Sequence, residues 1–224
     1  MKSDLLTPNV ERRSMKPALA DYRLYLVTDS RLNKGYSVLE QVRLALQGGV
    51  RIIQIREKEL PENDFMKVAS EALKLTRKEG AFLIINDSVG VARAAGADGL
   101  HLGQGDMALE DARRALGEDV TIGVSVKTVE EAAEAEKNGA DYVAVNGVFP
   151  TATKEDLGYL PGLEGVAEIR RCTCVPVVAI GGINLQNCRS VIKAGAHGIA
   201  VVTAITMSDD IPAVCRSFFK ELGR

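Results

Sequence analysis

One segment of the sequence places an amide and two cations in alternation with aliphatic residues. It reads Arg51-Ile52-Ile53-Gln54-Ile55-Arg56-Glu57-Lys58. In an extended strand, successive side chains point to opposite faces, so Ile53 and Ile55 share one face. The other face carries Gln54, Arg56 and Lys58. Burying such cations without anions costs several kcal/mol each, so we expect this face to bind an anionic substrate. An internal ion pair with a carboxylate of the chain is the alternative.

Two aspartates follow the next two predicted strands. Asp87 directly follows Asn86 after an aliphatic run, and Asp106 ends the run His101-Leu102-Gly103-Gln104-Gly105-Asp106. Mg²⁺ typically takes one or two carboxylates, keeps several waters and bridges phosphates. Either aspartate alone would also suit the N-cap of the helix that follows it. Because the two lie on neighbouring strands beside the cationic strand, we expect a magnesium site. His101 is expected to point inward near the same place, as a structural residue.

Hydroxyl groups, glycines and a lysine follow the later strands. The segment 146–156 is long for a connection between a strand and a helix, and such loops are usually functional; a solvated surface loop is the alternative. It contains Thr151, Thr153 and Lys154, and a further hydroxyl, Ser125, follows an earlier strand. The last two strands end at Gly181-Gly182 and Val202-Thr203. Glycine allows backbone N–H groups to approach an anion closely, which favours phosphate binding there.

These candidate residues all lie on or just after predicted strands. Along the whole sequence, predicted strands alternate regularly with predicted helices. The expected strands lie near residues 23–28, 51–56, 81–86, 99–102, 120–123, 142–145, 176–180 and 198–202. Strict alternation indicates right-handed βαβ units and a parallel sheet. Eight units favour an α/β fold of the (β/α)₈ TIM-barrel type, whose active sites lie at the C-terminal ends of the strands. A doubly wound open sheet is the alternative.

Composition excludes several classes of function. The 224 residues include 28 Lys plus Arg and 30 Asp plus Glu, a net charge of −2, which argues against a general nucleic-acid binder. Aromatic residues are 4% and Trp is absent, so an aliphatic core is expected. No apolar run approaches the roughly 18 residues of a membrane span. The N-terminus lacks a signal-peptide core, and a cytoplasmic location is expected. Residues 1–20 are expected to form an arm or an extra helix, and 21–224 the catalytic barrel.

Together, these motifs resemble the thiamine-phosphate synthase family, also called thiamine-phosphate pyrophosphorylase. The likeness runs from Tyr25 to about Ser208. The motifs that carry it are Gln54-Ile55-Arg56-Glu57-Lys58, Asn86-Asp87, His101-Leu102-Gly103-Gln104-Gly105-Asp106, Phe149-Pro150-Thr151-Ala152-Thr153-Lys154 and Ala179-Ile180-Gly181-Gly182-Ile183. The chain departs from the family pattern before Phe149, where it has Asn146-Gly147-Val148.

The resemblance implies a transferase that joins two small molecules. Hydroxymethylpyrimidine diphosphate and hydroxyethylthiazole phosphate would give thiamine phosphate and pyrophosphate. The residues implied for the pyrimidine diphosphate are Gln54, Arg56, Lys58, Asn86, Ser125 and Lys154. Those implied for the thiazole phosphate are Thr151, Thr153, Gly182, Val202 and Thr203. Asp87 and Asp106 would bind Mg²⁺.

Other functions remain open on the same barrel. A thiazole tautomerase-like paralogue would typically lack the cationic strand and the Mg²⁺ residues, which this chain retains. An isomerase or synthase of phosphosugars or of the tryptophan pathway would carry an inward acid–base pair. The chain could also be a non-catalytic barrel that binds a phosphorylated metabolite. An activity assay distinguishes this function from the enzymatic ones. No nucleic-acid or membrane partner is expected, and the sequence leaves open whether copies form a homo-oligomer.

Overall fold

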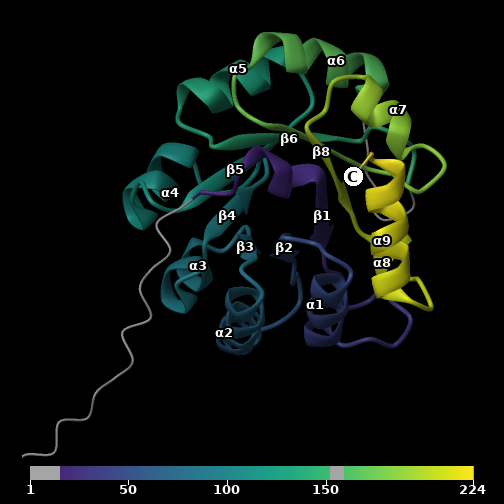
Figure 1. Cartoon of the computed structure of the whole chain (residues 1–224). Helices are drawn as coiled ribbons and strands as arrows, with labels where there is room; N and C mark the ends of the chain where they lie inside the picture. Colours follow the sequence, from purple (N-terminus) through teal and green to yellow (C-terminus); the bar gives the residue numbers. More distant parts are fainter. Residues whose placement is uncertain (1–15, 152–158, 224) are drawn as a thin grey trace, which may run out of the picture.

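The centre of the molecule is a closed barrel of parallel strands (Figure 1). A computed structural model describes residues 16–151 and 159–223. The strands are β1 (Leu24–Val27), β2 (Ile52–Ile55), β3 (Phe82–Asn86), β4 (Gly99–Leu102), β5 (Thr121–Val126), β6 (Tyr142–Asn146), β7 (Val177–Ile180) and β8 (Gly198–Val201). They pair in chain order, and β8 closes onto β1. The (β/α)₈ prediction is confirmed, and the open-sheet alternative is wrong.

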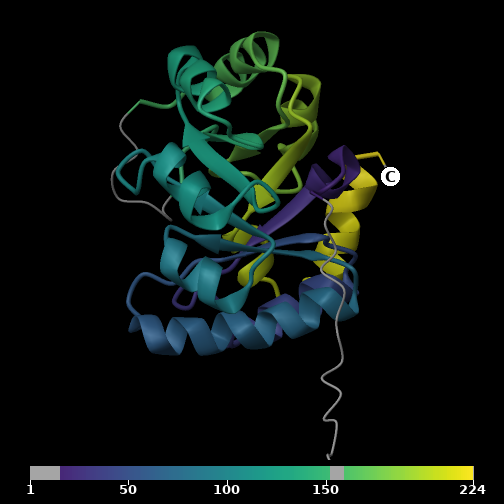
Figure 2. The same ribbon diagram turned by 90° about the vertical axis from the view of Figure 1, so that its left-hand side faces the viewer.

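Helices form the outer layer around these strands, as Figure 1 and the view turned by 90° in Figure 2 show. They are α1 (Val38–Gln47), α2 (Glu62–Lys78), α3 (Val89–Ala95), α4 (Leu109–Leu116), α5 (Val129–Lys137), α6 (Gly162–Cys172), α7 (Cys188–Lys193), α8 (Thr203–Thr206) and α9 (Ile211–Glu221), and a short 3-10 helix, η1 (Leu19–Arg23), precedes β1. Local sequence sets their ends. The Thr128 hydroxyl caps α5 by accepting from the Glu131 N–H at 3.2 Å, and Gly96 ends α3 with φ 69°.

Two apolar clusters separate the interior of the barrel from its outer layer. Ile53 and Ile55 belong to the outer cluster, between strands and helices, whereas Ile52 belongs to the inner one. The predicted facing of β2 is therefore confirmed, with Gln54 on the same side as Ile52. The inner cluster also contains Tyr22, Tyr25, Phe82 and Tyr142. The outer cluster is largely aliphatic, as expected, whereas the inner one also contains these four aromatic side chains, which the composition did not predict.

The N-terminal helix η1 lies against the barrel at the start of β1 and β8. Tyr22 is buried, and a side chain at Gly198 would place its Cβ 1.7 Å from the Tyr22 carbonyl oxygen. The Arg23 guanidinium donates to the Leu222 carbonyl, which ties η1 to the end of α9. The expected arm or helix over 1–20 falls largely on residues 1–15, which lie outside the described part of the chain. None of the described helices combines the length and apolar character needed to span a lipid bilayer.

Candidate active site

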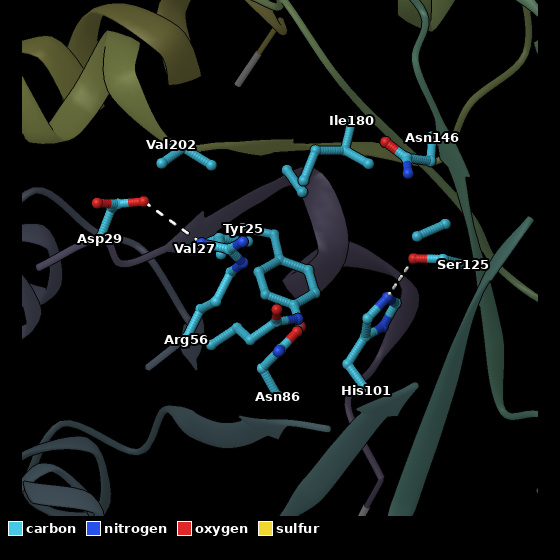
Figure 3. A pocket seen from close by; sticks show the side chains of 13 residues that line it. Tyr25, Val27, Asp29, Arg56, Asn86, His101, Ser125, Asn146, Ile180 and Val202 are labelled. Atoms are coloured by element: carbon cyan, nitrogen blue, oxygen red, sulfur yellow. Dashed lines mark hydrogen bonds and ion pairs between the residues drawn. The ribbon is translucent and has the colours of Figure 1, made fainter. Parts of the chain in front are cut away.

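A cavity of about 80 Å³ opens at the C-terminal ends of the strands (Figure 3). Its lining residues are Tyr25, Val27, Asp29, Gln54, Arg56, Asn86, His101, Ser125, Ala144, Asn146, Ile180, Ala200 and Val202. Five of them were predicted as site residues: Gln54, Arg56, Asn86, Ser125 and Val202. The strands therefore bring residues distant in sequence to the mouth of the barrel, as the fold class predicts.

Arg56 lies in this cavity beside a carboxylate that sequence reasoning missed. Its Nη1 is 3.5 Å from Oδ2 of Asp29, just after β1, and Figure 3 shows the two side chains facing each other. The other oxygen of Asp29 accepts the backbone N–H groups of Arg31 and Leu32 at 2.8 and 2.7 Å. These two hydrogen bonds fix the Asp29 side chain within the turn that follows β1. The guanidinium carries five N–H donors, so this single long contact leaves it able to bind an anion.

Lys58 pairs with one of the predicted metal ligands. Its Nζ lies 2.9 Å from Oδ2 of Asp87, with 51% and 29% of the two side chains exposed. Both cations of the β2 segment thus contact carboxylates, as the ion-pair alternative predicted. A pair this exposed contributes only about 0–1 kcal/mol. It does not explain why the cations are placed here, and Lys58 can exchange Asp87 for a phosphate at little cost.

Asp87 adopts an unusual backbone conformation. Its φ is 62°, the left-handed region, and among the described residues it is the one residue other than glycine with a positive φ. The Asp87 N–H donates to the His101 carbonyl of β4 at 2.9 Å, which fixes this turn at the end of β3. Non-glycine residues in sparsely populated conformations cluster at active sites, because surrounding structure must hold them there.

Asp87 and Asp106 lie within hydrogen-bonding reach of each other. Burial and the hydrogen bond with Asp87 raise the pKa of the Asp106 carboxyl. For Asp87, burial acts in the same direction but is outweighed by hydrogen bonds with Asp106 and Lys58 and by the Lys58 charge, so its pKa is lowered. Two carboxyl groups this close to each other are a donor set that a divalent cation would fit.

Neither aspartate caps a helix. Ser88 is the N-cap of α3 and accepts from the Val91 N–H, whereas Ala108 precedes α4 without a side-chain cap. Asp106 accepts the Gly103 N–H at 2.6 Å, within the turn after β4. The capping alternative is therefore wrong for both. In the described part of the chain, no group of three or more His, Cys, Asp or Glu side chains gathers.

His101 and Ser125 lie side by side at one edge of the cavity, on the paired strands β4 and β5 (Figure 3). The His101 Nε2 lies 2.9 Å from the Ser125 Oγ, and its Nδ1 lies 2.9 Å from the hydroxyl of the buried Tyr142. The inward direction expected for His101 is confirmed. Gln104, between β4 and α4, donates to the Ser125 carbonyl at 2.7 Å. These contacts hold Ser125 where its hydroxyl borders the cavity.

A second cavity, of about 370 Å³, adjoins the first. Its lining residues are Asn146, Thr151, Ile180, Gly181, Gly182, Ile183, Asn184, Ala200, Val201, Val202, Thr203 and Ala204. Four of the predicted phosphate-binding residues line it: Thr151, Gly182, Val202 and Thr203. Thr153 and Lys154, predicted beside them, lie outside the described residues. Asn146, Ile180, Ala200 and Val202 line both cavities, so ligands in the two would meet.

Known proteins share this barrel and its sequence. A family model described as thiamine monophosphate synthase matches residues 24–205. The thiamine-phosphate synthase of Clostridium novyi (strain NT) is 46% identical over 197 residues, 88% of this chain and 97% of that protein. That of Syntrophomonas wolfei subsp. wolfei is also 46% identical over 197 residues, 88% of this chain and 94% of that protein.

Solved structures agree with this likeness. The thiamine phosphate pyrophosphorylase from Pyrococcus furiosus has a TM-score of 0.84 and 40% identity, covering 91% of this chain and 96% of that one. The N-acetylmannosamine-6-phosphate 2-epimerase from Clostridium perfringens has a TM-score of 0.64 at 19% identity, covering 86% and 92%, and shares the fold alone. The chain therefore belongs to the thiamine monophosphate synthase family of (β/α)₈-barrel transferases.

Proposed function

We propose that this enzyme joins hydroxymethylpyrimidine diphosphate to hydroxyethylthiazole phosphate and releases pyrophosphate. One observation of the structure carries the proposal: a cation-bearing cavity and a glycine-lined cavity meet along shared residues at the mouth of the barrel. Such a pair suits two phosphorylated substrates with their reacting ends together. The relatives that this chain resembles are thiamine-phosphate synthases, which supports the same substrates.

The first cavity is proposed to bind the pyrimidine diphosphate. Its assigned residues are Gln54, Arg56, Lys58, Asn86, Ser125 and Lys154. Negative charge develops on the departing oxygens as the bond to the pyrimidine methylene breaks. Fixed cations aimed at those oxygens stabilise that charge without reorganising. At about 4 Å and an effective dielectric near 20, each unit charge pair contributes roughly 4 kcal/mol. Several such pairs account for a large part of a barrier reduction.

Asp87 and Asp106 are proposed to hold Mg²⁺. Their proximity and the raised pKa of Asp106, which burial and Asp87 cause, fit a site where a cation would offset the repulsion between the two carboxylates. When bound, Mg²⁺ supplies a Lewis acid that stabilises charge on the departing diphosphate. Lys58, which contacts Asp87, would then be released toward a diphosphate oxygen. The chain's own part is to place Lys58 and the two carboxylates together beyond the ends of β2, β3 and β4, next to the segment that carries Arg56 into the cavity.

The second cavity is proposed to orient the thiazole phosphate through Thr151, Thr153, Gly182, Val202 and Thr203. Pyrophosphate leaves with the electron pair of the carbon–oxygen bond, and the thiazole nitrogen donates its pair to the resulting pyrimidine-methylene cation. This dissociative route requires no nucleophile from the protein. Holding the two substrates in contact converts the capture into an intramolecular step, which accounts for much of the catalysis by positioning.

Gly182→Ala is expected to raise the KM for the thiazole phosphate about tenfold and to change kcat less. Gly182 has a φ of 63°, and an added Cβ would lie 2.5 Å from the Pro150 carbonyl oxygen and 2.8 Å from Phe149 Cβ. Phe149 and Pro150 would have to shift, and with them the neighbouring Thr151, which lines the second cavity. Gly96→Ala at the end of α3 is the matched control, because Gly96 has a similar φ of 69° and an added Cβ meets nothing within 4 Å. An unchanged KM for Gly182→Ala would contradict this phosphate site.

The function itself is tested by mixing both phosphorylated substrates with Mg²⁺ and the purified chain. Thiamine phosphate and pyrophosphate are expected in equal amounts, measured by chromatography and a pyrophosphate assay. Conversion of a thiazole phosphate tautomer without coupling would instead support the tautomerase-like alternative. Binding of either phosphorylated compound without any turnover would support the non-catalytic barrel.

A further inference from the structure

A chain of hydrogen bonds crosses the interior of the barrel below the proposed substrate cavity. Gln54 Nε2 donates to the Tyr25 hydroxyl at 2.7 Å, and the Tyr25 and Tyr142 hydroxyls lie 3.0 Å apart. Tyr142 in turn contacts His101 Nδ1, and His101 Nε2 contacts Ser125 Oγ, each at 2.9 Å. Two residues assigned to the substrate, Gln54 and Ser125, are therefore connected through buried groups that the mechanism above does not use.

With the Gln54 amide nitrogen facing the Tyr25 oxygen, as the structure has it, this series of hydrogen bonds has one order of protons that satisfies every donor. The Tyr25 oxygen accepts from Gln54, so its own proton needs another acceptor. Within the described residues, the Tyr142 oxygen is the partner within reach. Tyr142 then donates its proton to His101 Nδ1. The neutral imidazole consequently carries its proton on Nε2 and donates it to Ser125 Oγ. In the reverse order, the Tyr25 proton would be buried without an acceptor, which costs about 1–3 kcal/mol.

The environment keeps the two phenols as donors. Burial raises the pKa of both Tyr25 and Tyr142 well above the ordinary value. Both side chains are almost completely inaccessible to solvent, at 2% and 0% exposure. Their orientation therefore depends on the hydrogen bonds between them rather than on water.

The sequence also makes room for Tyr142 at one specific place. Gly123 on β5 pairs with Tyr142 on β6, and a Cβ added there would lie 2.0 Å from Tyr142 Cζ. Glycine inside a strand weakens it, and it often marks a close approach of another group. Here the group is the Tyr142 ring, which lies across Gly123 and brings the hydroxyl to His101. Position 123 thus bears directly on how the hydroxyl is placed.

We propose that Tyr142 is a positioning residue, whose hydroxyl holds His101 in the Nε2–H tautomer and so makes Ser125 a hydrogen-bond donor to the substrate. Because the Ser125 oxygen accepts from His101, its own proton points to the cavity that Ser125 borders. The site then recognises an acceptor atom on the substrate at this position, such as an unprotonated ring nitrogen. This inference rests on the proposed function for the identity of the ligand, but the tautomer of His101 does not.

The tautomer is measured by ¹⁵N–¹H correlation spectra of the histidine rings in the substrate-free enzyme. The sequence has two histidines, and a His197→Asn variant assigns their signals. His101 is expected as the Nε2–H tautomer in the wild type, and as a mixture containing Nδ1–H in Tyr142→Phe. The same variant is expected to raise the KM for the pyrimidine diphosphate about tenfold with kcat largely retained, because the loss of one hydrogen bond to substrate has that size.

Tyr22→Phe is the matched control. Its ring centroid lies 5.2 Å from that of Tyr142 in the same buried cluster, but no described contact joins its hydroxyl to His101. This variant is expected to leave both the tautomer and the KM unchanged. If Tyr22→Phe changes the His101 tautomer and the KM as much as Tyr142→Phe does, the effect is one of general packing, and the positioning role of Tyr142 is overturned.

Three results would overturn the proposal: an Nδ1–H tautomer in the wild type, an unchanged tautomer in Tyr142→Phe, or an unchanged KM in that variant. If Tyr142→Phe fails to fold, Ser125→Ala decides by the same spectra. His101 keeps its Nε2–H there if Tyr142 sets the tautomer, and loses it if Ser125 does. Failure of the proposed coupling reaction in the wild type would leave these spectra unaffected, so the two failures are distinguishable.

Discussion

Excess chelator is expected to abolish formation of thiamine phosphate by this enzyme, and added Mg²⁺ to restore it. The departing diphosphate carries several negative charges, whereas Arg56 and Lys58 already lie beside Asp29 and Asp87. Without a divalent cation, the two adjacent carboxylates would repel the diphosphate as it enters the cavity. The measurement is product formed with and without chelator, followed by titration with Mg²⁺. Undiminished product in excess chelator would remove the metal from the mechanism.

Asp87→Asn tests whether this need for Mg²⁺ arises at Asp87. The variant is expected to lower turnover at least about 100-fold, the usual cost of losing an electrostatic stabiliser. Asparagine is preferred to alanine here because it tolerates the left-handed backbone that Asp87 adopts, at φ 62°. Calorimetric titration of Mg²⁺ in the presence of pyrophosphate should show weaker binding. Asp64→Asn, which removes a surface carboxylate paired with Lys67 on α2, should change neither quantity. Normal turnover in Asp87→Asn would refute the assignment.

The barrel was predictable because its signals are local and repeated. Most units have a short apolar strand and a helix followed within two residues by a glycine, and the period-two alternation of side chains predicted the faces of β2 correctly. The nearness of Asp87 and Asp106 was predictable for a related reason. Parallel neighbours place their C-terminal ends together, and β3 pairs with β4. These inferences needed only the strand order, which right-handed βαβ units determine.

Other parts of the site depend on contacts that no local pattern encodes. Asp29 reads in the sequence as an ordinary turn residue, and its contact with Arg56 follows from the pairing of β1 with β2. Tyr25 and Tyr142 read as core residues, and they come from strands far apart in the chain. Their hydroxyls meet because the closed barrel directs both rings inward. The polar network inside the barrel therefore required three-dimensional closure, which composition and periodicity do not provide.

Arg56→Ala is expected to lower turnover at least about 100-fold while the barrel remains folded. The guanidinium lies in the cavity, and its side chain is 23% exposed, so a diphosphate oxygen can reach it. The fold should survive, because the partner it leaves behind, Asp29, still accepts two backbone N–H groups of its own turn. Activity is measured under saturating Mg²⁺ and both substrates, with thermal unfolding followed by circular dichroism.

A conservative variant and a surface control sharpen this test. Arg56→Lys keeps the charge but loses the planar set of donors, so it should recover part of the activity if charge and geometry both matter.

Arg31→Ala is the surface control. It removes an arginine near the same end of the barrel that pairs with Glu59 and has 66% of its side chain exposed. Exposed pairs contribute about 0–1 kcal/mol, so this variant should keep normal turnover and stability. If Arg31→Ala and Arg56→Ala lower turnover equally, the general positive potential at the mouth of the barrel is what matters. A cation fixed at the departing diphosphate would then not be needed. Normal turnover in a folded Arg56→Ala would show that the cation inside the barrel takes no part in bond cleavage.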